Sequence, residues 1–246
     1  GIKGVLTNNA ANTLDLLITS AAKNLSWSGS YDGVTPMDAW DVSNTDNTNW
    51  LNSLSEHTYY REYPADNVGD NVTFGGSGVS VSGTNYVNVT TNVLPATVVF
   101  NSSVPYSLSG VGGIGGATAL VMLEANTASV SLNTTNTYTG GTVVGGGTLI
   151  ITNDAALGTG ALNLSGGALT LDGPVVSSRS VTLTSNATIT VSSGNAASLG
   201  GMIDGGKNLT KTGDGTLILA GANTNTGATT VSGGTLNVPT GGAINN

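Results

Sequence analysis

The sequence predicts an all-β solenoid, in which short strands coil around one core and each turn of the coil stacks on the previous one. The first observation is an internal repeat: Asn136 to Gly160 returns, shortened, as Asn223 to Pro239, at an offset of 87 residues. Repetition of this kind usually indicates a stacked array. Each copy reads as a short strand, a Gly turn and a second short strand, with few helix-forming residues between them.

The composition is the second observation. The 246 residues include 37 Gly and no Cys, and only 8% are charged. Gly and Asn tolerate the positive φ angles of tight turns, whereas Thr and Val favour strands. No apolar run reaches the length of about 18 residues that a transmembrane helix needs. We therefore expect a regular β-structure without a transmembrane segment.

The charge balance argues against whole classes of partner and chemistry. The formal net charge is −8, and the six Lys and Arg residues are scattered. Nucleic-acid binding needs clustered basic residues, so no nucleic-acid partner is expected. The absence of Cys excludes disulfides, thiolate metal sites and Cys nucleophiles.

The N-terminal part of the chain differs from the rest. Gly1 to Ser20 predicts two short strands around Asn8-Asn9, and Leu25 to Tyr63 holds all three Trp, four of the seven Tyr and the single His. An open solenoid end exposes unpaired backbone and needs a cap. We therefore predict an N-terminal strand segment and an aromatic-rich, irregular cap or side lobe over residues 1–70, followed by the solenoid over residues 71–246.

The repeats resemble a known family. Leu209 to Leu219 reads LTKTGDGTLIL, and Asn136 to Thr142 reads NTYTGGT. Both are similar to the autotransporter-associated β-strand repeat of bacterial passenger regions and very large secreted proteins. The Lys-x-Gly-x-Gly lead-in is missing from the first copy. The resemblance implies a right-handed β-helix outside the cell and carries over no catalytic residues. Trp27, Trp40 and Trp50 stand in a pattern like the opening of such secreted proteins.

Three patterns offer alternative chemistry. Gly110 to Gly115 matches GxGxxG, but that motif needs a following helix to hold a pyrophosphate, and a strand is expected there. His57 has no partner set for a metal or a catalytic triad. Two carboxylate pairs could support a polysaccharide lyase or hydrolase, the less favoured enzyme hypothesis: Asp38 with Asp41, and Asp66 with Asp70.

No cofactor is predicted, with calcium as the one alternative. Asp41 to Asn49 reads DVSNTDNTN and is rich in oxygen ligands. It lacks the Gly and the acidic twelfth ligand of an EF-hand loop. Hydrogen bonds from Asn and Asp side chains within turns are the simpler explanation.

The favoured function is non-enzymatic and structural. We expect a protein at the bacterial cell surface or outside the cell, processed from a longer precursor. It would stack head to tail with copies of itself into a fibre, or form a segment of a larger adhesin. The last rung (one turn of the solenoid) ends without a polar cap, so we expect apolar residues at both ends to form the subunit junction: Val5, Leu6, Leu14, Leu16, Leu17, Leu236, Val238 and Ile244.

The alternative function is a glycan-binding adhesion module. Trp and Tyr faces stack on sugar rings, and carboxylates accept hydrogen bonds from sugar hydroxyls. This alternative requires exposed, aligned aromatic side chains in the N-terminal lobe. The candidate contacts are Trp27, Trp40, Trp50, Tyr59 and Tyr60.

Overall fold

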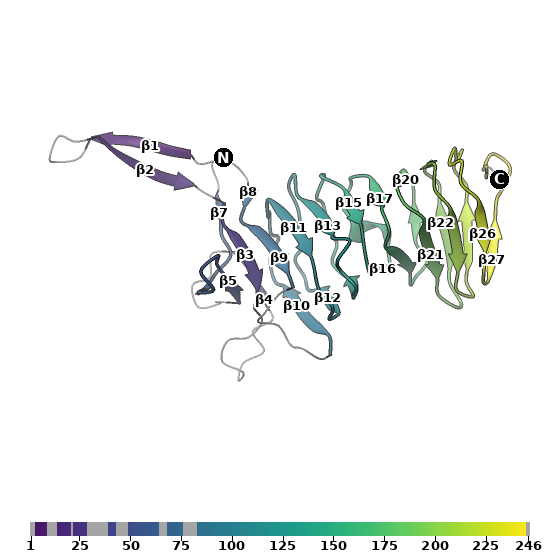
Figure 1. The fold of residues 1–246 in the computed structure, drawn as a ribbon, viewed down its shortest axis with the longest axis horizontal. Helices are drawn as coiled ribbons and strands as arrows, with labels where there is room; N and C mark the ends of the chain where they lie inside the picture. The colour runs from purple at the N-terminus through teal and green to yellow at the C-terminus, as the bar shows by residue number, and fades with distance from the viewer. Residues whose placement is uncertain are drawn as a thin grey trace.

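The computed structural model is an elongated β-solenoid of about seven turns, whose strands lie across the long axis and stack along it (Figure 1). It describes residues 3–8, 14–20, 22–28, 39–42, 49–63, 68–75 and 83–244. The prediction of an all-β solenoid is confirmed. Within the described residues no helix is long and apolar enough to cross a membrane.

Three sheets run along the solenoid. Sheet I has ten strands, in the spatial order β6 (His57–Thr58), β5 (Trp50–Leu51), β3 (Asn24–Trp27), β9 (Asn71–Phe74), β11 (Thr97–Phe100), β13 (Ala119–Met122), β15 (Thr142–Val144), β17 (Leu162–Leu164), β20 (Val181–Leu183) and β23 (Ile203–Gly205). Sheet II has nine, in the order β4 (Ala39–Trp40), β10 (Asn85–Val89), β12 (Tyr106–Ser109), β14 (Ser129–Leu132), β16 (Thr148–Ile151), β18 (Ala168–Leu171), β21 (Ala187–Val191), β24 (Leu209–Thr212) and β26 (Thr229–Val231). Sheet III has four, β19 (Val176–Ser177), β22 (Ala196–Leu199), β25 (Thr216–Leu219) and β27 (Thr235–Asn237).

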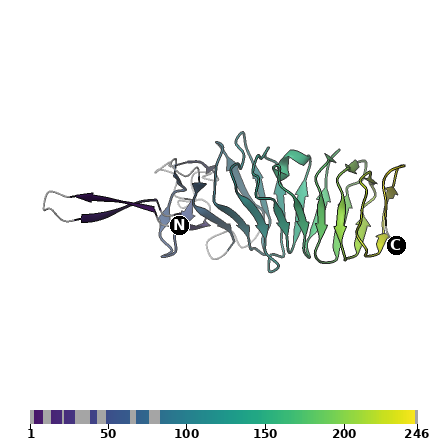
Figure 2. The same cartoon turned by 90° about the horizontal axis from the view of Figure 1, so that it is seen from above.

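Neighbouring rungs pair in parallel and in register. Thr148 faces Ala168, and Ala168 faces Thr188, so one rung takes 20 residues at this point. Figure 2 shows the strands stacked side by side along the rod. Because the strand period is two, a register kept from rung to rung places the same face of every strand inward.

The core consists of columns of inward side chains, one from each rung. In sheet I one column runs from Leu25 through Val72 and Val98 to Leu120, all buried. The next column starts at Phe74 and Phe100, whose rings stack with centroids 4.9 Å apart. Each fully buried aliphatic side chain contributes about 1.5–3 kcal/mol relative to an exposed one, so a regular column stabilises every rung it joins.

The N-terminal end of the solenoid carries an aromatic cluster. Trp27, Trp40 and Trp50 pack against Tyr60 and Phe74, with ring centroids 5.0 to 6.4 Å apart. Strands β5 and β6 continue sheet I in antiparallel pairing beyond β3. Strand β3 itself pairs in parallel with β9, so the stacked sheets begin inside the segment 1–70.

Two small sheets complete the N-terminal part. Strands β1 (Lys3–Asn8) and β2 (Leu14–Ser20) form an antiparallel hairpin, which extends away from the end of the solenoid (Figure 1). Strands β7 (Glu62–Tyr63) and β8 (Val68–Gly69) form a second antiparallel pair. The two predicted N-terminal strands are therefore present, but they form a sheet of their own rather than a rung.

Candidate functional site

The repeats build a hydrogen-bonded connection between three successive rungs. Asn136 accepts a hydrogen bond at Oδ1 from the Ile114 N–H (2.8 Å) and donates from Nδ2 to the Ala156 carbonyl (2.6 Å). In the second copy, Asn223 accepts from the Ile203 N–H (2.8 Å) and donates to the Ala243 carbonyl (2.7 Å). Both amides are at most 4% exposed.

The same two groups, one backbone donor and one backbone acceptor, are therefore satisfied at the equivalent position of each copy. A buried polar group left unsatisfied costs about 1–3 kcal/mol. The Ile114 and Ile203 N–H groups each donate to the side-chain oxygen of an asparagine in the next rung. The asparagine side chain therefore joins the two rungs.

The Gly turn between the two strands of each repeat has a backbone requirement. Gly147 has φ 67° and its counterpart Gly234 has φ 62°, in the left-handed region that favours glycine. A Cβ at either position would also overlap a carbonyl of the previous rung, that of Ala128 or of Gly215. The repeat therefore needs glycine here for both conformation and space.

The two copies differ two residues after the asparagine. Tyr138 is fully buried, and its hydroxyl lies 2.7 Å from the Thr142 hydroxyl. Burial raises the pKa of Tyr138 to about 12, although the Thr142 hydrogen bond and Arg179 act in the opposite direction. Its counterpart Asn225 is also buried and donates to the Gly227 carbonyl.

Lys211 is a charged side chain inside the core, at 0% exposure. Its Nζ donates to the carbonyls of Thr212 (2.7 Å), Gly213 (2.7 Å) and Gly233 (3.0 Å). Burial lowers the pKa of Lys211, and Asp214 opposes that change. Three carbonyls match the three donors of an ammonium group, so Lys211 joins its own turn to the Gly turn of the next rung.

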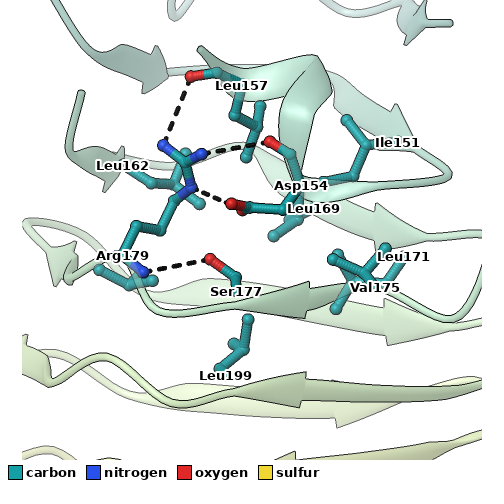
Figure 3. Close-up of a pocket in the computed structure, with 11 residues that line it drawn as sticks. Ile151, Asp154, Leu157, Leu162, Leu169, Leu171, Val175, Ser177, Arg179 and Leu199 are labelled. Atoms are coloured by element: carbon teal, nitrogen blue, oxygen red, sulfur yellow. Dashed lines mark hydrogen bonds and ion pairs between the residues drawn. The ribbon is translucent and has the colours of Figure 1, made fainter. Parts of the chain in front are cut away.

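Arg179 fixes the tail of the first repeat (Figure 3). The tail forms a 3-10 helix, η1 (Asp154–Leu157), and Arg179 Nε donates to the Asp154 carboxylate at 2.8 Å. The guanidinium also donates to the carbonyls of Leu157 and Gly158. These groups border a cavity of about 10 Å³ lined mainly by aliphatic side chains, which has room for about one water molecule. The arrangement anchors a loop and leaves no space for a substrate.

The core side chains on the strands of the second repeat are less enclosed than their counterparts in the first repeat. Val144 is fully buried, whereas its counterpart Val231 is 47% exposed. Leu149 is fully buried, whereas its counterpart Leu236 is only partly buried against the core. Strands β26 and β27 are the last of sheets II and III within the described residues, so no described rung covers them.

Comparison with known families agrees with this geometry. Residues 125–151 and 209–238 match the family described as Passenger-associated-transport-repeat. Two segments of the chain are therefore similar to this repeat. No curated protein and no solved structure matches the chain. The predicted resemblance to autotransporter passenger repeats is therefore confirmed, and both the repeats and the solenoid fit an autotransporter passenger domain.

Outside the passenger-associated-transport repeats, four of the five predicted glycan contacts lie in the core. Trp27, Trp40, Trp50 and Tyr60 are at most 2% exposed, and burial together with Glu62 raises the pKa of Tyr60. Their edge-to-face packing fills the N-terminal end, so these rings are not available to stack on a sugar. Tyr59 alone is partly exposed, and the Arg61 guanidinium lies 4.5 Å from its ring centroid.

The carboxylate pairs of the enzyme hypothesis do not form a described site. Asp38 and Asp66 lie outside the described residues. Asp70 is fully buried and accepts hydrogen bonds from the backbone N–H groups of Lys23 (2.7 Å) and Arg61 (3.1 Å). It holds the N-terminal lobe against the first rungs, which is a structural task.

The remaining candidate motifs have structural positions. The GxGxxG segment is followed by strand β13 rather than a helix, as expected, and Ile114 within it pairs with Val93. His57 is exposed on β6. Residues 43–48 of the candidate calcium loop lie outside the described part of the chain, so that prediction stays open. Among described residues, no three His, Asp or Glu side chains gather as a metal site.

The predicted junction residues lie at opposite ends of the molecule. Five belong to the β1–β2 hairpin: Val5, Leu6, Leu14, Leu16 and Leu17. The other three, Leu236, Val238 and Ile244, are partly buried hydrophobic residues at the C-terminal end. Sequence reasoning missed the roles of Asn136, Asn223 and Lys211. The recurrence of Asn at the same place in both copies was the available signal for the first two.

Proposed function

We propose that this chain is a non-enzymatic, extracellular structural segment of an autotransporter-type passenger, and that its solenoid stacks head to tail with further copies. The observation that carries the proposal is the difference between equivalent core residues of the two repeats. Val144 and Leu149 are enclosed by following rungs, whereas Val231 and Leu236 face the C-terminal end. Apolar residues at core positions of this last described rung support the proposal that a further layer of β-structure covers the rung.

The proposed layer is the β1–β2 hairpin of a second copy. The hairpin forms its own sheet at the opposite end, and its strands contain four Leu, one Val and one Ile. Adding a strand to the edge of β26 or β27 satisfies backbone groups by β-augmentation. An interface between two different surfaces does not close on itself unless the rotation permits, so it generates a filament.

The N-terminal aromatic cluster supports the structural part of the proposal. It closes one end of the core with five packed rings, so the two ends are built differently. The buried Asn, Lys and Arg side chains described above connect rungs to each other instead of facing a cleft. A localisation outside the cell rests on the passenger repeats.

The test compares the wild-type chain with Leu236→Lys/Val238→Lys by negative-stain microscopy and light scattering across a concentration series. Fibres or concentration-dependent oligomers that disappear in the variant are expected. The matched control is Val176→Lys/Ile218→Lys, which changes two apolar residues on the outer face of sheet III away from the end. Monodisperse wild-type rods, or equal loss of assembly in the control variant, would refute head-to-tail stacking.

A further inference from the structure

We propose that the outer face of sheet II is an ice-binding surface. Six consecutive strands, β12 to β24, each place one or two hydroxyl groups outward, and β26 adds one more. We call this set the hydroxyl array: Ser107, Ser109, Ser129, Ser131, Thr148, Thr170, Thr188, Thr190, Thr210, Thr212 and Thr230.

The array is most regular over β21 and β24, whereas Ile150 and Ala168 occupy two of the aligned outward positions on β16 and β18. Across the strands, Thr190 faces Thr170 on one side and Thr212 on the other, and Thr188 faces Thr210. Parallel strands lie about 4.8 Å apart, and alternate residues along a strand lie about 6.6 Å apart. Hexagonal ice repeats its oxygen atoms at comparable intervals on the faces parallel to its long axis. A grid of hydroxyls can therefore meet many ordered water molecules at once.

The hydroxyl positions are well defined. The Thr190 and Thr212 Oγ1 atoms lie 2.8 Å apart, within the usual range of an O–H···O hydrogen bond. Threonine has a β-branched side chain with few χ1 rotamers, so holding the array in one arrangement loses little conformational entropy. Thr188, Thr190, Thr210 and Thr212 form its densest part, on two adjacent strands.

The face lacks the features that other partners require. Lys211 is the single charged residue in the strands β12 to β26 of sheet II, and it points into the core, although the chain carries a net charge of −8. The outward positions of these strands hold no aromatic side chain for stacking on a sugar, and the exposed Tyr86 faces Ser107 from the preceding strand β10, at the border of the array. Protein interfaces centre on buried Trp, Tyr and Arg anchors, which are also missing from these positions. A neutral, periodic lattice of hydrogen-bonding groups is the partner that fits.

The outer face of sheet I differs over the same rungs. Its aligned outward column passes through Val99, Val121, Val143, Asn163 and Thr182 to Asp204. That column changes from apolar to amide, hydroxyl and carboxylate, so it offers no repeated hydrogen-bonding group. The repeated hydroxyl groups belong to sheet II, although the same rungs contribute strands to both sheets.

The experiment measures partition of the whole chain into a slowly growing ice front, together with inhibition of ice recrystallisation. The disrupting variant is Thr188→Lys/Thr210→Glu, which places an opposite-charge pair on facing residues and leaves the net charge unchanged. The matched control is Thr216→Lys/Thr235→Glu, the same pair on facing residues of sheet III. Thermal unfolding of all three proteins confirms that each is folded.

We expect the wild-type chain and the control to enter ice and slow recrystallisation, and the disrupting variant to lose both effects. If that variant does not fold, Ile150→Lys/Thr170→Glu replaces it on the same face. A wild-type chain excluded from ice overturns the proposal, and so does equal loss in the control. Retention on insoluble cellulose without any effect on ice also overturns it, in favour of a neutral polysaccharide.

Discussion

The two repeats place the same residues on different faces of the solenoid. The strands of the first copy, β15 and β16, lie in sheets I and II, whereas those of the second, β26 and β27, lie in sheets II and III. The asparagine connections and the positive-φ glycines are nevertheless alike. The repeat therefore specifies a local corner of strand, turn and strand with its links to neighbouring rungs, and is independent of the face on which it lies.

The copies also differ in what covers them. In the first copy, β17 and β18 pair with β15 and β16, so its core residues are enclosed on both sides. In the second copy, β24 and β25 pair with the preceding side of β26 and β27. Equivalent substitutions in the two copies therefore separate the contribution of the repeat's own contacts from that of the next rung.

The largest contrast is expected for Leu149→Ala against Leu236→Ala. Truncating a fully buried leucine costs about 2–5 kcal/mol, because transfer free energy is lost and a cavity remains. Leu236 is partly exposed, so its truncation should cost about 1 kcal/mol or less. Denaturant unfolding of the isolated chain at low concentration measures both values. Equal costs would show that the end of the second repeat is already enclosed.

A smaller contrast is expected for Asn136→Ala against Asn223→Ala. Each change leaves a backbone N–H and a carbonyl of adjoining rungs without their partner. We expect about 2–3 kcal/mol for Asn136, because its acceptor Ala156 is fully buried. We expect about 1 kcal/mol less for Asn223, because its acceptor Ala243 is partly exposed and can bond to water.

Hydrogen exchange provides the control for the asparagine pair. The Ile114 and Ile203 amides should lose protection in their own variant and keep it in the other. Loss of protection throughout the chain in either variant would contradict a local connection.

Short strands with apolar residues at every second position, separated by Gly turns, predicted the solenoid. So many strands of three to five residues can bury their apolar sides only by stacking. That pattern could not predict whether the aromatic side chains point into the core or toward solvent. An aromatic-rich segment is expected both for a lobe that caps a core and for a lobe that binds a glycan, so the sequence around Trp40 does not distinguish them. In the structure Trp40 is fully buried. Contacts between rungs decide the matter, and they join residues far apart in sequence.

The buried ionic groups were beyond sequence reasoning for a related reason. Lysine is rarely fully buried. The alternation of Lys211 with the outward Thr210 and Thr212 was therefore not enough to predict that Lys211 points into the core. Two of the carbonyls that accept from Lys211 belong to the next two residues, but the third, that of Gly233, lies 22 residues away and is brought to Lys211 only by the fold. Arg179 likewise reaches η1 across a gap of more than 20 residues in sequence to Asp154.

The smallest expected effect concerns Tyr138, which the second copy replaces with Asn225. Tyr138→Phe keeps the ring and removes the hydroxyl, so at neutral pH it should cost about 1 kcal/mol through the lost contact with Thr142. Its pKa is about 12 in the folded chain against 10.0 for an unperturbed tyrosine. A raised acid pKa stabilises the fold below pH 10, and that stability is lost as pH rises through 12.

The difference in unfolding free energy between wild type and Tyr138→Phe should therefore narrow as the pH rises from 10 toward 12. Tyr60 and Tyr106 also have raised pKa values, but they are present in both proteins and cancel in the comparison. The measurement is denaturant unfolding at a series of alkaline pH values. If the difference in unfolding free energy stays constant from pH 10 to pH 12, Tyr138 is accessible to solvent in the folded chain. The first repeat would then be less completely enclosed than its neighbouring rungs.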